Sequence, residues 1–138
     1  MKIALAGLGL VAALMSAPHA AAEPTTVFFK SPLDGLSCEV DWQQSDIADQ
    51  VYCQTYSPPR TVKMDGNGVL TTCKDFDRPA GAAPCSLGDP PENTATLAYG
   101  QMNVTGPFTC ASAETGISCT IPNGIGFTIS DVGITPIG

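Results

Sequence analysis

The cysteines of this chain restrict its fold more than any other feature. They are Cys38, Cys53, Cys73, Cys85, Cys110 and Cys119. No two of them have the C-x-x-C spacing that is typical of a thiolate zinc site, so we expect disulfide bonds and no bound metal. Because disulfides form in oxidising compartments, the framework also predicts a protein that works outside the cytoplasm.

The first 22 residues have the pattern of a secretory signal peptide. Lys2 supplies a positive start, and residues 3–14 form an apolar run that is too short to span a bilayer. Ala20-Ala21-Ala22 is a small-residue cleavage site, so we expect residues 1–22 to be removed and residues 23–138 to form a single domain. No cysteine lies at this site for lipid attachment. The sequence therefore predicts a secreted or cell-envelope protein with no stable membrane insertion after cleavage.

The rest of the chain alternates apolar and polar residues with the period of β-strands. No segment sustains a helical period, and Gly and Pro recur between the alternating runs. We predict an all-β domain of about seven to nine strands, a small disulfide-stapled antiparallel sandwich or barrel built from hairpins. One helical turn is expected over residues 44–50, and a long loop near 78–92. The residues expected in the core are Leu36, Cys38, Val40, Ile117, Cys119, Ile121, Ile125, Phe127 and Ile129.

The predicted hairpins suggest how the cysteines pair. The runs that contain Cys110 and Cys119 alternate on either side of a turn at residues 113–115, so these two cysteines face each other. Cys38 has Phe29 at the equivalent place in its own hairpin, so it must reach the next strand. The predicted pairs are Cys38–Cys53, Cys73–Cys85 and Cys110–Cys119.

One motif occurs twice in the chain without a gap. Ser31–Val40 matches Ser112–Ile121, and both copies contain Gly, an apolar residue, Ser and Cys in succession. Two explanations remain open, an internal duplication or the same hairpin sequence reached twice. Either way the repeat concerns structure and has no functional content of its own.

Composition excludes several classes of function. His19 is the only histidine and lies in the predicted leader, so the mature chain has no imidazole for Ser-His-Asp or Cys-His catalysis. The formal net charge of −7 opposes binding to nucleic acid, and to anionic lipid headgroups. No assembled catalytic motif is present. We therefore expect no enzyme activity and no cofactor.

A secreted, non-enzymatic binding or interaction module is the first functional hypothesis. Its partner would be a protein or an envelope glycan, and its candidate interaction surface is Trp42, Tyr99, Gly100 and Gln101. Gly100 between an aromatic residue and an amide indicates a β-bulge or a close approach of the backbone. Trp42 with Tyr52 and Tyr56 would be able to stack on sugars. The alternative for Trp42 and Tyr99 is a structural role in packing.

A carboxylate-dependent hydrolase of envelope polysaccharide is the second hypothesis. It would use two carboxylates about 5–10 Å apart in a cleft. The candidates are Asp75, Asp77, Glu114 and Asp131. Convergence of two acidic side chains in a concave site is the feature that would distinguish this hypothesis from the first.

Several motifs resemble those of a known family. They are Gly35-Leu36-Ser37-Cys38, Tyr99-Gly100-Gln101, Gly106-Pro107-Phe108-Thr109-Cys110 and Gly126-Phe127. With these motifs, residues 29–131 resemble a family of small exported actinobacterial proteins catalogued as a domain of unknown function. The resemblance implies an exported protein and a fold, but no reaction. Members carry His and Arg where this chain has Ile125 and Asp131, so an activity that needs those two side chains would be absent here.

Overall fold

The computed structural model describes residues 23–74 and 89–138 as strands joined by turns and loops, and these residues include no helix. The strands are β1 (Thr25–Lys30), β2 (Leu36–Trp42), β3 (Gln50–Tyr56), β4 (Pro59–Asp65), β5 (Leu70–Lys74), β6 (Ala95–Thr96), β7 (Met102–Thr105), β8 (Phe108–Ala113), β9 (Gly116–Thr120), β10 (Gly126–Ser130) and β11 (Gly133–Ile137). This is more strands than the sequence predicted. No helix in this part of the chain is long and apolar enough to cross a membrane.

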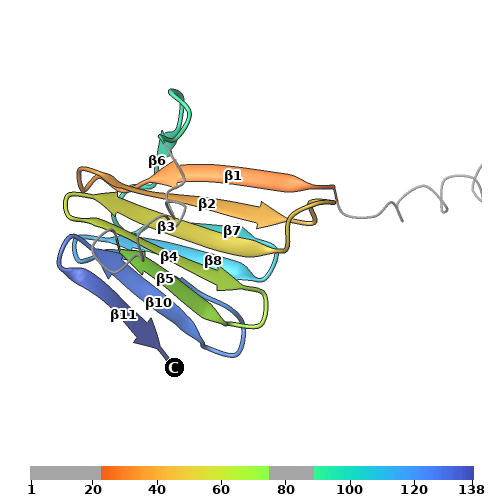
Figure 1. Cartoon of the computed structure of the whole chain (residues 1–138). Helices are drawn as coiled ribbons and strands as arrows, with labels where there is room; N and C mark the ends of the chain where they lie inside the picture. The colour runs from red at the N-terminus through yellow and green to blue at the C-terminus, as the bar shows by residue number, and fades with distance from the viewer. Residues whose placement is uncertain (1–22, 75–88) are drawn as a thin grey trace, which may run out of the picture.

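The strands form two sheets that pack face to face (Figure 1). Sheet A has the order β5-β4-β3-β2-β1-β6, and sheet B has the order β11-β10-β9-β8-β7. Neighbouring strands are antiparallel except for β1 and the short β6, which are parallel. The predicted all-β, disulfide-stabilised fold is thus confirmed, in its sandwich form.

Apolar side chains of the two inner faces fill the space between the sheets. All nine residues predicted for the core lie there, eight of them buried and Ile125 partly buried. The reason is the alternation seen in the sequence, because a strand with period 2 turns every second side chain toward the other sheet. Phe29, Phe108 and Met64 complete the centre of this core.

Two disulfides staple neighbouring strands inside the core. They are Cys38–Cys53 between β2 and β3 and Cys110–Cys119 between β8 and β9, as predicted. The sulfur atoms of Cys38, Cys53 and Cys119 lie within 4.8 Å of one another, so the two disulfides meet across the sandwich. Cys85 lies outside the described residues, and the pair Cys73–Cys85 therefore stays a prediction.

The repeated motif occupies equivalent places in the two sheets. In each copy the motif cysteine lies on a strand between its disulfide partner and a phenylalanine. The sets are Cys38 with Cys53 and Phe29, and Cys119 with Cys110 and Phe127. The repeat therefore supplies the same packing unit to each half of the core.

The segment between β2 and β3 differs from its prediction. Residues 44–49 form bends rather than the expected helical turn. The Asp49 side chain accepts a hydrogen bond from the backbone N–H of Gln43 at 2.8 Å, and Gln43 has a positive φ of 62°. A carboxylate that bonds a backbone N–H six residues earlier competes with helical bonding, which explains why the prediction was wrong. Of the expected long loop, residues 78–88 lie outside the described residues.

Candidate functional site

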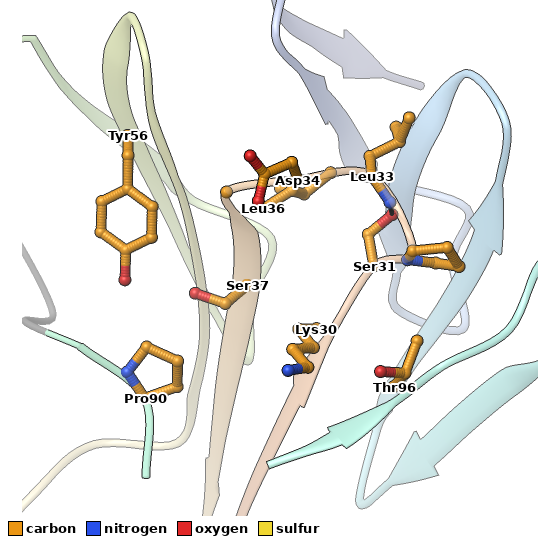
Figure 2. Close-up of a pocket in the computed structure, with 11 residues that line it drawn as sticks. Lys30, Ser31, Leu33, Asp34, Leu36, Ser37, Tyr56, Pro90 and Thr96 are labelled. Atoms are coloured by element: carbon orange, nitrogen blue, oxygen red, sulfur yellow. Dashed lines mark hydrogen bonds between the residues drawn. The ribbon is translucent and has the colours of Figure 1, made fainter. Parts of the chain in front are cut away.

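A groove of about 340 Å³ lies around the turn between β1 and β2 (Figure 2). It is lined by residues 30–37, Tyr56, Pro90 and Thr96. A second hollow of about 340 Å³ adjoins it and is lined by residues 33–36, Thr55, Tyr56, Ser57 and Asp131. Because residues 33–36 and Tyr56 line both hollows, the β1–β2 turn and the Tyr56 ring stand between them.

The β1–β2 turn is held by its own hydrogen bonds. The buried Ser31 hydroxyl accepts a bond from the Leu33 N–H at 2.9 Å, and the Ser31 N–H donates to the Leu36 carbonyl at 2.9 Å. Gly35 has a φ of 76°, and a Cβ built on it would lie 3.4 Å from the Tyr56 ring. Since a serine-capped turn and a left-handed glycine fix this backbone, the groove is formed before any ligand arrives.

Tyr56 forms one wall of the groove. It ends β3 just before the cis Ser57–Pro58 bond, and 42% of its surface is exposed. Gln54 donates a hydrogen bond to the Tyr56 hydroxyl at 3.1 Å, and Figure 2 shows the Ser37 side chain directed toward that hydroxyl. Burial raises the pKa of Tyr56 above its usual value, and the nearby Asp89 also raises it. The phenol therefore stays protonated and is able to donate as well as accept.

The lining of the groove combines apolar surface with a few polar groups. Leu33 is partly exposed, while Lys30 and Asp34 are exposed and carry opposite charges. Thr96 on β6 faces the groove from the side opposite Tyr56 (Figure 2). Sites for small organic ligands have this composition, an apolar wall with a few polar groups that fix orientation.

Three of the residues singled out in the sequence form a corner before β7. The N–H of Gly100 donates to the Ser112 carbonyl at 2.8 Å, and the N–H of Ser112 donates to the Gln101 carbonyl at 3.0 Å. With a φ of 88° at Gly100, this is a β-bulge of the kind that the sequence indicated. Tyr99 is 42% exposed beside it.

Trp42 lies away from that corner. It is half-buried at the end of β2, and its indole packs so closely on Gly106 that a Cβ there would overlap the ring. Gly106 follows β7 whereas Tyr99 precedes it, so the strand separates the two aromatic side chains. None of the four residues Trp42, Tyr99, Gly100 and Gln101 lines the groove. Of the aromatic residues considered for sugar stacking, Tyr56 alone lines it.

The proposed hydrolytic carboxylates are only partly described. Asp75 and Asp77 lie outside the described residues. Glu114 is exposed in the β8–β9 turn, and Asp131 is exposed in the β10–β11 turn. Asp131 lines the second hollow together with Asp34, whereas Glu114 does not line it.

One pair of carboxyl groups was not singled out in the sequence. Glu39 and Asp41 lie on the outward face of β2, where Asp41 is only 1% exposed and accepts hydrogen bonds from Thr26 at 3.1 Å and Gln50 at 3.0 Å. Burial, followed by the hydrogen bond and the charge of Asp41, raises the pKa of Glu39 to about 7. In the sequence, Glu39 and Asp41 alternate with Cys38 and Val40, and this pattern already indicated that the two carboxyl groups lie on one face of the strand.

The groove around Tyr56 is therefore the described site with the best combination of shape and chemistry. Comparison of the chain with protein-family models, curated proteins and solved structures finds no match. Assignment of a function rests on the chain's own residues and geometry.

Proposed function

We propose that this protein is a secreted, non-enzymatic binding module that holds an envelope glycan in the groove at the β1–β2 turn. The observation that carries the proposal is the half-exposed Tyr56 ring between two adjoining hollows. The predicted leader and the two described disulfides support an extracytoplasmic protein.

The chemistry of the groove favours a sugar. A tyrosine ring offers an apolar face for the C–H side of a pyranose, and its hydroxyl offers a polar edge. The exposed Lys30 ammonium and Asp34 carboxylate line the same groove and would bond sugar hydroxyls. A volume of about 340 Å³ lies at the lower end of the range for ligand pockets, which suits one or two sugar rings.

The rigidity of the groove supports a role in ligand binding. Cys38 and Cys53 join β2 to β3, the two strands that position Ser37 and Tyr56. Since both walls are ordered in advance, little conformational entropy is lost when a ligand binds.

Replacing Tyr56 tests the proposal. We expect Tyr56→Ala to weaken binding about two- to tenfold, since stacking contributes roughly 0.5–1.5 kcal/mol, whereas Tyr56→Phe keeps the ring and most of the affinity. Binding is measured by sedimentation with insoluble peptidoglycan and by calorimetry with soluble linear polysaccharides.

The matched control is Tyr99→Ala, which removes a tyrosine with the same exposed fraction of 42% from a different surface. Retained binding in this variant supports the groove. Loss of binding in Tyr99→Ala but not in Tyr56→Ala would move the site to the corner before β7. Binding of the wild type to none of the polysaccharides would overturn the glycan assignment, and release of reducing sugar would favour the carboxylate-dependent hydrolase instead.

A further inference from the structure

Charge is distributed unequally between the two sheets. The chain has a formal net charge of −7, yet no strand of sheet B contains a charged residue. The strands of sheet A, by contrast, contain charged residues of both signs: Lys30, Glu39, Asp41, Arg60, Lys63, Asp65 and Lys74. When the sheet B strands of two copies approach each other, no charged strand residue of one copy is brought against a like charge of the other.

Strand β7 forms an outer edge of sheet B, and half of its backbone groups point away from the sheet. The N–H of Ser112 on β8 donates a hydrogen bond to the carbonyl of Gln101. With the register of β7 and β8, this bond shows which residues of β7 direct their backbone groups toward β8. Because antiparallel bonding alternates from one residue to the next, Asn103 bonds toward β8. The N–H and C=O groups of Met102 and Val104 therefore face outward.

Two of the usual protections of an edge strand, charge and proline, are missing from β7. Met102 and Val104 are 63% and 66% exposed, and the strand has neither a charged residue nor a proline. The opposite edge of sheet B, β11, contains Pro136, and β6 at the edge of sheet A is only two residues long. Unprotected edges with exposed apolar side chains are templates for pairing with another strand.

We propose that β7 pairs antiparallel with β7 of a second copy of this chain, so that two B sheets join into one continuous sheet. A two-fold axis through Asn103 places Met102 opposite Val104 of the second copy, and the reverse. These are the residues whose backbone groups face outward, so each pair exchanges both of its hydrogen bonds.

The side chains fit the same register. Met102 and Val104 project from the same outer face of sheet B. Pairing therefore places the Met102 side chain of each copy beside the Val104 side chain of the other copy. The two Asn103 side chains meet at the axis. The Thr105 hydroxyl already donates to the Asn103 side-chain oxygen at 2.8 Å, which leaves the amide N–H groups to donate across the axis.

The proposed interface consists of two four-residue strands, and its small size limits the affinity of the dimer. A single pair of short strands buries less surface than the standard interface, so we expect a dissociation constant of about 10–100 μM. The dimer does not depend on the identity of any ligand, and it would present two copies of the Tyr56 groove to a repetitive polymer.

Sedimentation equilibrium over about 1 μM to 1 mM tests the pairing. We expect the mass of the wild type to rise from monomer to dimer, and Val104→Lys to weaken association at least tenfold because an ammonium would be desolvated beside Met102. The matched control is Val69→Lys, which changes a residue of similar exposure, 60%, in the turn before β5. It should associate like the wild type.

A second variant and a site-specific measurement keep the test independent of folding defects. Val104→Pro removes an N–H that bonds no residue of β8, so it should leave the fold intact and abolish the dimer. Amide exchange at Met102 and Val104 should slow as concentration rises. A wild type that stays monomeric at 1 mM, dimerisation of Val104→Lys equal to the wild type, or exchange at these two amides that does not change with concentration would overturn the proposal.

Discussion

Glu39, Asp41 and Tyr52 form a group of ionisable side chains on the outward face of sheet A, and their contacts shift the pKa values of Glu39 and Tyr52. Asp41 is buried and held by Thr26 and Gln50, and it lies beside Glu39. Glu39 pairs across the ladder with Tyr52, whose pKa is raised by burial and by the charge of Glu39. Burial and the neighbouring Asp41 raise the pKa of Glu39 to about 7, so its neutral form predominates in the folded protein below that pH.

A pH-dependent change in stability is expected from Glu39. Its pKa is raised from 4.5 to about 7 on folding, so the folded state holds a proton that the unfolded state has lost between these values. The free energy of unfolding that Glu39 contributes therefore falls as pH rises from about 4.5 to 7. Glu39→Gln should remove this fall. The Tm of the variant, relative to that of the wild type, should therefore increase as pH rises from about 4.5 to 7. Thermal unfolding at several pH values measures this.

The control for this experiment is Glu114→Gln, the same substitution at an exposed turn. Its Tm should follow that of the wild type at every pH. A Tm difference between Glu39→Gln and the wild type that does not vary with pH would contradict the assignment.

The hairpins depend on glycines at a few defined positions. Gly116, which begins β9, has a φ of 127°, and a Cβ there would overlap the Ile129 carbonyl of β10. Both the backbone conformation and the close approach of β10 require glycine at this position. Gly124 has a φ of 90° but no neighbouring atom within 4 Å of a Cβ, so only the conformation requires glycine there.

Alanine substitutions at these two positions should differ in their effects. We expect Gly116→Ala to lower the free energy of unfolding by about 3–4 kcal/mol. The alanine would adopt an unfavourable positive φ, and its Cβ would also clash with the Ile129 carbonyl. Gly124→Ala should lower it by roughly 1–2 kcal/mol, the cost of a left-handed conformation alone. Chemical denaturation measures both. Equal losses would show that the approach of β10 to Gly116 does not restrict that position.

At the scale of the whole molecule, the disulfides and the predicted leader together predict a processed, oxidised chain. Intact mass spectrometry of the protein expressed from its full sequence should give a chain that starts at Glu23 with all of its cysteines oxidised. Non-reducing digestion should yield a peptide that links Cys73 to Cys85, together with the two described disulfides. A free thiol, or a product that retains residues 1–22, would contradict the predicted framework.

Much of the fold was predictable because its signals are local. Alternation in Leu36–Val40 and Ile117–Ile121 identified the core face, and the spacing around the 113–115 turn identified Cys110 and Cys119 as partners. Tyr99-Gly100-Gln101 indicated the bulge because a left-handed glycine is a local requirement. The helical turn at 44–50 was wrong because the Asp49 carboxylate bonds back to Gln43, a contact that propensity does not describe.

The sequence by itself determined the all-β class, the inward faces of the strands and the described disulfides, since each depends on period and spacing along the chain. Only the tertiary structure decided which outward residues come together. Tyr56 reaches the β1–β2 turn because β3 pairs with β2, Asp41 is buried by residues of β1 and β3, and Met102 and Val104 face outward because β7 lies at an edge. Those properties depend on the order of strands within a sheet, and alternation is the same whichever strands are neighbours.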